Sequence, residues 1–451
     1  MTFLNKIIFF LICACIVVST LAYGTVHQPT LAIFYAVIAA MVVGWMVDCF
    51  QSGALRYSRS ALQIPVYLVV IYAFIQIIPF GSFPETAGVS GIPRTISAEP
   101  FATETTGLHF LALAFFLSLT LVYLDTAARL RRIVTLIAIF GFVFAFFAIL
   151  QSVLSPTKIY GIFERSSPFG SFVNRHNFAA YIEMTMAVPL GMMFVGAVAR
   201  DKKLLYITAI TLMGVALLLS GSRGGFVSLL AEIILLVILT TQTRGAKAIA
   251  LKLALSLMLV GAVVAGAIFV GGESSLTRFA ETASSKDITT NRTHIWAVSA
   301  KVIVANLPFG AGLGAFAQAY TPFDDFNGLE RVEQAHNDYL QVIADAGIVG
   351  VVIGGLFIFL LIREARRAVR VANTFRRGVA IGAISGIFAV LIHSLFDFVL
   401  HTTAISILFL TLIAMLVASG REYADDATDE QDGRSKHRRK SSSVTAFSRK
   451  G

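Results

Sequence analysis

Apolar residues in this chain form long, nearly uninterrupted runs that are separated by shorter polar segments. About twelve runs approach or reach the length of a helix that spans the hydrocarbon core of a bilayer. They cover approximately residues 7–23, 30–47, 62–80, 108–124, 133–154, 177–199, 204–220, 226–241, 250–270, 347–362, 378–396 and 402–419. None shows the alternation of apolar and polar residues that a membrane β-barrel needs. Since backbone groups in lipid must be satisfied within a segment, the pattern predicts an all-α, polytopic transmembrane bundle.

The longest polar segment, residues 271–346, is predicted to contain short helices. Residues 293–305 carry Ile295, Val298 and Val302 at helical spacing, and this helix should stop before Pro308. A second helix is predicted over residues 332–346. It places His336 on an apolar face, opposite a polar face formed by Asp338, Gln341 and Asp345.

These segments divide the chain into three parts. Residues 1–132 are predicted to be N-terminal transmembrane helices. Residues 133–419 form a second membrane region that includes the 271–346 loop. Residues 420–451 are acidic and then basic, and they predict a disordered tail.

Composition and charge support a membrane protein and give it an orientation. Hydrophobic residues make up 57% of the chain and charged residues only 14%, which excludes an ordinary soluble protein. Most of the 36 Lys and Arg residues fall on one side if the N-terminus is cytoplasmic, as the positive-inside rule requires. The net charge of +10 is thereby a topological signal beside anionic lipid, and we expect no nucleic-acid partner.

The first apolar run and the cysteines are both compatible with a multi-span membrane protein. The first run lacks a convincing small-residue cleavage site, so we expect it to be retained as a helix rather than removed as a signal peptide. Cys13, Cys15 and Cys49 all fall in the first two runs, which leaves neither a disulfide framework nor a zinc site in an outer loop.

Arg223 is the sharpest candidate for chemistry. It lies in Ser220-Gly221-Ser222-Arg223-Gly224-Gly225, between two runs and on the outer side, where the positive-inside rule disfavours arginine. Guanidinium offers planar, bidentate donors that suit phosphate oxygens, and the glycines allow close approach. The alternative is an arginine that merely reaches the interface from a tight turn.

Other basic residues occupy neighbouring outer segments. Arg175 and His176 open a predicted helix, whose N-terminal amides would favour an anion. Arg165 lies in the same outer segment, and Arg292 lies in the long loop. Each is also compatible with an ordinary surface turn or loop charge.

His336 is the candidate general base, because histidine is the residue type best suited to proton transfer at physiological pH. Asn337, Asp338 and Gln341 follow it and could orient its ring. The alternative is a histidine that simply satisfies the protein core. Glu183 and Asp397 fall near the outer ends of their runs and could line the same cavity, since ionisable groups within a membrane protein are functional candidates.

No metal or nucleotide is expected. Asp324 and Asp325 are adjacent, but no histidine or third acid lies at helical spacing from them. Gly310, Gly312 and Gly314 have no surrounding βαβ unit and predict a flexible turn rather than a nucleotide-binding loop.

At these residues the chain resembles the O-antigen ligase and polymerase superfamily of bacterial inner-membrane glycosyltransferases, over roughly residues 135–415. The ligase-like pattern is His336-Asn337 followed after nine residues by Gly347-x-x-Gly350. Further similar motifs are Ser220-Gly221-Ser222-Arg223-Gly224, the Trp296 helix with Pro308-Phe309-Gly310-Ala311-Gly312-Leu313-Gly314, and His393-Ser394-Leu395-Phe396-Asp397-Phe398.

The resemblance implies a glycan donor on undecaprenyl pyrophosphate and transfer in the periplasm to a hydroxyl of another glycan, with inversion and without metal or nucleotide. Arg223 and His336 match the family's functional arginine and histidine, and Arg175 and Arg292 match other basic residues of the site. Lipid A–core is the favoured acceptor, O-antigen or exopolysaccharide polymerisation is the close alternative, and a chain-length regulator would be a further partner.

Two alternatives come from other classes of protein. A transporter or flippase for lipid-linked sugars would also have many spans, but it normally binds its substrate near the bilayer midplane. Here the polar groups gather at one face, which favours an enzyme. A purely structural scaffold would explain the spans but not the placement of the arginines and the histidine.

Overall fold

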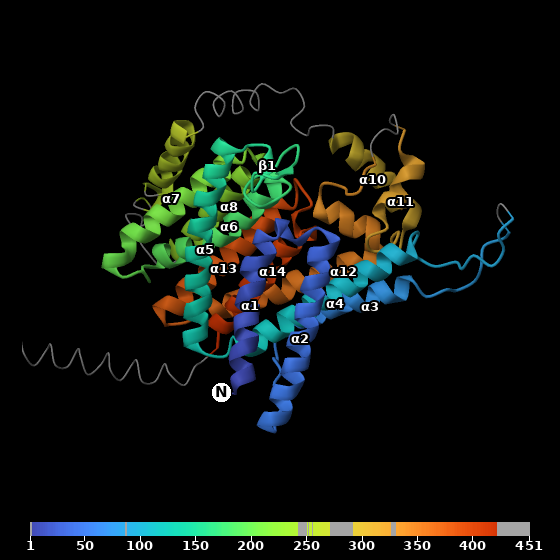
Figure 1. Ribbon diagram of the computed structural model, residues 1–451, viewed down its shortest axis with the longest axis horizontal. Coiled ribbons are helices and arrows are strands. Elements are labelled where there is room, and N and C mark those ends of the chain that lie inside the picture. The colour runs from blue at the N-terminus through green and yellow to red at the C-terminus, as the bar shows by residue number, and fades with distance from the viewer. Residues whose placement is uncertain are drawn as a thin grey trace, which may run out of the picture.

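The computed structural model describes residues 2–85, 88–241, 250, 252–254, 256–270, 292–325 and 331–421 (Figure 1). Residues 271–291 of the predicted loop, and all but the first two residues of the predicted tail, lie outside the described residues.

The described chain is a bundle of helices with one two-stranded ribbon. The long helices are α1 Phe3–Leu21, α2 Gln28–Ser52, α3 Gln63–Gln76, α4 Pro100–Tyr123, α5 Ala127–Leu154, α6 Arg175–Val195, α7 Lys203–Leu219, α8 Arg223–Thr241, α10 Arg292–Asn306, α12 Asp338–Ala368, α13 Thr374–His393 and α14 Thr403–Ser419. The short elements are η1 Tyr23–Thr25, β1 Lys158–Ile159, β2 Phe163–Glu164, η2 Arg200–Lys202, α11 Phe316–Tyr320, η3 Thr321–Phe323 and η4 Val399–His401. Strands β1 and β2 pair antiparallel.

The predicted membrane spans are confirmed as helices. Ten helical segments of the described chain, Lys252–Val270 among them, are long and apolar enough to cross a membrane. The other two predicted runs are the shorter apolar helices α3 and α14. The protein is therefore an all-α, multi-pass membrane bundle.

Helices α6 and α13 pack together at the centre of this bundle. Gly378, Gly382 and Gly386 recur every fourth residue on α13, a spacing that lets two backbones approach closely. A Cβ atom added to Gly191 of α6 would lie 2.3 Å from the Gly382 nitrogen. The two backbones thus touch at Gly191 and Gly382, and α14 covers this seam with buried residues.

Helix α10 confirms the predicted helix over residues 293–305, whereas the predicted helix over 332–346 begins later. The chain becomes helical only at Asp338, because the Asn337 side chain accepts hydrogen bonds from the Tyr339 and Leu340 amides and caps the helix. At Gly347 the backbone turns out of helical geometry (φ 58°, ψ −144°), and a spanning helix then continues to Ala368.

The predicted polar face of this helix is buried, and Leu340 on the opposite side packs against the α10–α11 core. Asp338, Gln341 and Asp345 are 6%, 2% and 3% exposed, so their shared face points into the protein. It can be buried because its polar groups find partners within the protein: Gln341 accepts from the Ala335 amide and donates to Asp345, and Asp338 accepts from Ser394.

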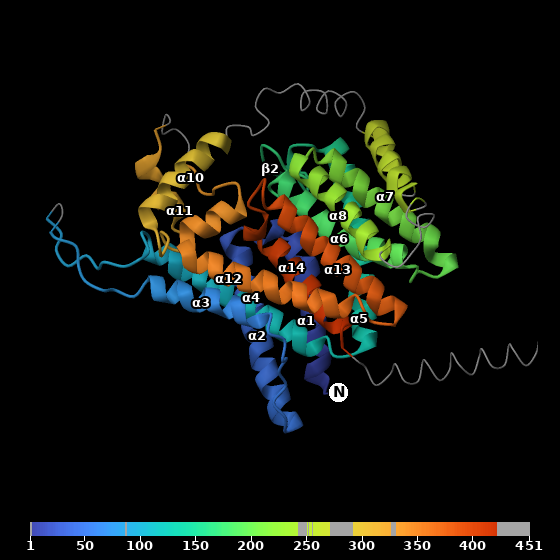
Figure 2. The same cartoon turned by 180° about the vertical axis from the view of Figure 1, so that it is seen from behind.

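Helices α10 and α11 form a small unit beside the main bundle. Its core contains Val298, Val302, Phe316 and Tyr320. The unit packs on the first turns of α12, while the later part of α12 runs beside α3 (Figure 2). In Figure 1 this unit and β1 lie at one end of the molecule, and the N-terminus lies at the other.

Candidate active site

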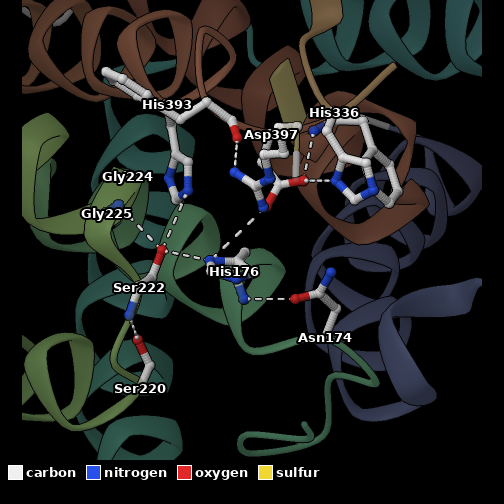
Figure 3. Close-up of polar contacts among 12 residues, drawn as sticks. Asn174, His176, Ser220, Ser222, Gly224, Gly225, His336, His393 and Asp397 are labelled. Carbon is white, nitrogen blue, oxygen red and sulfur yellow. Dashed lines mark hydrogen bonds and ion pairs between the residues drawn. The ribbon is translucent and has the colours of Figure 1, made fainter. Parts of the chain in front are cut away.

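Asp397 lies at the centre of a polar cluster at the end of the bundle that carries the α10–α11 unit (Figure 3). It follows α13 and is 2% exposed. One carboxylate oxygen is 3.1 Å from His336 Nδ1, and the other is 3.1 Å from Arg292 Nη2. Burial would raise the pKa of Asp397, but the hydrogen bond with His336 and the charge of Arg292 outweigh it and lower that pKa below its ordinary range. The carboxylate is therefore charged at neutral pH.

His336 is held by Asp397 on one side and remains open on the other. It has a φ of +49° and lies just before the cap of α12, so it precedes the helix instead of occupying the predicted apolar face. Its ring lies edge-on to Phe398, with centroids 4.8 Å apart, and its side chain is 32% exposed. Because Nδ1 faces the carboxylate, the tautomer with a proton on Nδ1 leaves the lone pair of Nε2 as a base.

Three helices that begin with an arginine meet around this pair. Helix α6 begins at Arg175, α8 at Arg223 and α10 at Arg292. Arg292 contacts Asp397, and His176 of α6 has its Nδ1 3.8 Å from the same carboxylate. Each N-terminus adds partial positive charge from its unpaired amides. The arrangement suits an anion that carries several oxygen atoms, such as a pyrophosphate.

Ser222 links the starts of α6 and α8. Its hydroxyl oxygen accepts from the Gly225 amide, is 2.9 Å from His176 Nδ1 and is 3.5 Å from His393 Nε2. The Arg175 side chain also reaches this turn, since a Cβ atom on Gly221 would lie 3.7 Å from its Nη1. The predicted candidates Arg175, His176 and Arg223 therefore border one turn, Ser220–Arg223.

A buried ion pair lies directly beneath this turn. His393, at the end of α13, places Nδ1 3.2 Å from both carboxylate oxygens of Glu183 on α6, and both residues are fully buried. Gly224 is needed for the imidazole to pack here, because a Cβ atom at that position would lie 2.8 Å from His393 Cδ2. The pair supports Ser222 from below.

The three predicted binding residues after His336 are engaged in local structure. Asn337 caps α12 and donates to the Leu395 carbonyl. Asp338 accepts from Ser394 Oγ and lies 3.1 Å from His401 Nδ1. Gln341 bonds Ala335 and Asp345. They fix the segment that carries His336 against the segment that carries Asp397, and substrate contact by these side chains stays a prediction.

Arg165 and the pair of aspartates lie apart from this cluster. Arg165 is exposed after β2, with its guanidinium 4.0 Å from the Phe163 ring centroid, and no contact among the described residues joins it to Asp397 or His336. Asp324 and Asp325 have no histidine at helical spacing, but His294 of α10 places its Nε2 3.0 and 3.7 Å from their carboxylates. Helical spacing could not reveal this contact because 30 residues separate His294 from Asp324.

Sequence reasoning named Asp397 but did not assign it the central position. The available signal was an ionisable residue four positions after His393, beside the end of a span. In the sequence, Ser222 stands out only as part of the glycine-flanked motif around Arg223. The contacts of its hydroxyl group form only where three separate elements meet in the fold.

Comparison with known protein families gives one match. Residues 208–355, about a third of the chain, match the family described as O-antigen ligase. The matched segment runs from α7 to the middle of α12 and contains Ser222, Arg223, Arg292 and His336. No curated protein matches the chain.

Proposed function

We propose, from the premise that this chain belongs to the O-antigen ligase and polymerase superfamily of membrane glycosyltransferases, that it transfers a glycan from undecaprenyl pyrophosphate to a hydroxyl group of an acceptor glycan. The favoured acceptor is lipid A–core, as for an O-antigen ligase. The reaction takes place at the periplasmic face of the bacterial inner membrane, with both termini in the cytoplasm.

The hydrogen bond between His336 and Asp397 is the observation that carries this proposal. Asp397 fixes the ring and stabilises the imidazolium that forms, while Nε2 takes the proton from the acceptor hydroxyl. The hydroxyl oxygen forms a bond to the anomeric carbon as the bond from that carbon to the pyrophosphate oxygen breaks. Attack opposite the leaving group inverts the anomeric centre.

The arginines and helix N-termini stabilise the departing group. Undecaprenyl pyrophosphate leaves with the bonding electron pair, and Arg175, Arg223 and Arg292, which begin α6, α8 and α10, neutralise that charge. Because these side chains supply positive charge, we propose that transfer needs no metal. Transfer by the purified protein should therefore persist in a chelator, and complete loss that a divalent cation restores would contradict this part of the proposal.

The first experiment compares variants in a deletion strain. His336→Ala and Arg223→Ala should reach the membrane at wild-type levels but lower glycan transfer by roughly 10²-fold or more. Arg200→Ala, which removes an exposed arginine in η2, is the control and should be active. Normal transfer by His336→Ala would remove the histidine from the mechanism, and loss of the protein itself would assign it a role in folding.

The same strains distinguish the ligase from the polymerase of this superfamily. Surface glycans and undecaprenyl-linked material are separated on gels from each strain. Long polymer retained on the carrier identifies a ligase. Loss of all long chains, with single repeat units on the carrier, identifies a polymerase.

A further inference from the structure

A second charged cleft lies at the opposite end of the bundle from the candidate active site. Its volume is about 510 Å³. Its walls come from the connection between α2 and α3, the end of α4, and the residue pair that follows α14. Three arginines line it: Arg56, Arg59 and Arg421.

The position of this cleft follows from α5. Asp125 lines the cleft two residues before α5 begins, whereas α5 ends four residues before β1 and its later half contacts Phe178 near the start of α6. A helix of 28 residues spans roughly 42 Å, which is more than the hydrocarbon core of a bilayer. The N-terminus also lies at the cleft end, where Arg129 donates to the Asn5 carbonyl. This is the cytoplasmic end in the predicted orientation.

The cleft keeps two positive charges that the described residues do not neutralise. Arg56 pairs with the buried Asp48, with Nε 3.3 Å from the carboxylate, and Asp125 pairs with Arg129 at 3.0 Å. Neither Arg59 nor Arg421 forms an ion pair within the described parts of the chain.

Arg421 is nevertheless held firmly in place. Its guanidinium donates to the carbonyls of Leu121 and Leu124 and to Ser58 Oγ. Neutral carbonyls orient the group without cancelling its charge. Arg59 is exposed on the other wall, 6.0 Å from the Tyr57 ring centroid. Two cations from segments far apart in sequence therefore face one cleft that also presents a serine hydroxyl.

Apolar side chains lie next to these cations. Leu121 and Val122 line the cleft, and Leu55 at its edge is 68% exposed. A basic rim beside an apolar wall at the end of a membrane bundle fits a phosphate headgroup with attached acyl chains. A free phosphate ion would gain nothing from the leucines.

We propose that this cleft binds an anionic phospholipid of the inner leaflet, with its phosphate between Arg59 and Arg421. Planar guanidinium groups match phosphate oxygens, and each basic residue near an anionic lipid contributes about 1 kcal/mol. The lipid would tie the α2–α3 connection to the end of α14. This proposal is independent of glycan transfer.

Lipid retention by the full chain tests the proposal. The protein is purified in detergent, offered phosphatidylglycerol or phosphatidylcholine, and examined by native mass spectrometry. Wild type should retain phosphatidylglycerol preferentially. Arg59→Gln should weaken that retention several-fold, and Arg59→Gln with Arg421→Gln should weaken it roughly tenfold or more. Arg59→Gln alone keeps the test valid if loss of Arg421 disturbs folding.

The control removes the same charge elsewhere on the predicted cytoplasmic face. Arg366 and Arg367 are exposed near the end of α12, outside the cleft, so Arg366→Gln with Arg367→Gln should retain lipid like wild type. An equal loss of lipid retention in this control would mean that general surface charge causes the effect, and it would overturn the proposal of a specific lipid site.

Two other occupants are distinguished by the same measurement. If inorganic phosphate at low millimolar concentration displaces the lipid, the cleft binds free phosphate and the lipid assignment is wrong. The acidic stretch 425–432 follows Arg421 closely in the sequence. If neutralising its Asp and Glu residues to Asn and Gln raises lipid retention by tenfold, the chain's own tail is the native occupant.

Discussion

At the scale of single residues, the candidate site depends on contacts that no local pattern contains. His336 and Arg292 are 61 and 105 positions from Asp397. The sequence could identify a titratable histidine and misplaced arginines, because residue type and topology suffice for that. It could not show that one buried carboxylate joins them, since only the packed bundle brings the end of α13 to the starts of α10 and α12.

The Glu183–His393 pair has a testable positioning role. Glu183→Ala should lower kcat by roughly 10–100-fold with a much smaller change in KM, because a displaced Ser222 turn shifts the groups that contact substrate. Glu183→Gln should restore most of the rate, since its amide oxygen still accepts from His393 Nδ1. Steady-state kinetics in nanodiscs make the measurement.

Glu232→Gln is the matched control for this pair. Glu232 is also fully buried in the bundle, but its carboxylate has no hydrogen-bond partner among the described residues. The control should leave kcat unchanged. If Glu183→Ala instead lowers only the amount of folded protein, with kcat per folded molecule intact, the pair is structural and does not position the site.

At the scale of elements, hydrophobic runs predict the spans well, because backbone groups in lipid must form their hydrogen bonds within the segment and a continuous apolar run can do so only as a helix. Helix starts were less predictable where a polar side chain competes for backbone groups. Asn337 shows this, since its cap begins α12 at Asp338 and places His336 outside the helix. The periodic pattern over 332–346 contained no sign of that competition. It also could not indicate that Asp338, Gln341 and Asp345 would find hydrogen-bond partners in the interior.

Gly347 is the element-scale position most sensitive to substitution. Its φ is +58°, and a Cβ atom would lie 2.1 Å from the Pro308 carbonyl oxygen. Gly347→Ala should therefore destabilise the protein by at least about 2–3 kcal/mol and lower activity, since it separates the α10–α12 contacts that position His336. Thermal unfolding in detergent and the transfer assay measure both effects.

Gly354 supplies the comparison within the same helix. A Cβ atom there meets nothing within 4 Å, and Gly354→Ala should leave stability unchanged or raise it by about 0.5–1 kcal/mol. Equal effects of the two substitutions would show that the break at Gly347 is not required.

At the scale of the whole molecule, the distribution of Lys and Arg predicts the orientation in the membrane. In that orientation the candidate site and the basic cleft face opposite compartments. Sequence alone could separate two faces, because the positive-inside rule depends on loop charge. It could not reveal which of the many basic residues on the inner side converge on one cleft.

Cysteine labelling tests this orientation. In a background with Cys13, Cys15 and Cys49 replaced by Ala, Glu164→Cys on exposed β2 should react with a membrane-impermeant maleimide in intact spheroplasts. Ala372→Cys, between α12 and α13, should react only after permeabilisation. The reverse labelling pattern would mean that the protein has the opposite orientation and that the candidate site faces the cytoplasm.

The glycine seam between α6 and α13 bears on the path by which the proposed lipid-linked donor would enter. Where the backbones touch at Gly191 and Gly382, no side chain can rotate aside to let the two helices part gradually. The seam carries His176, His393 and the support beneath Ser222, and it acts as a fixed wall. For the proposed lipid-linked donor, we therefore expect the entrance on the other side, where α10 and α11 rest on α12 through a separate, smaller core.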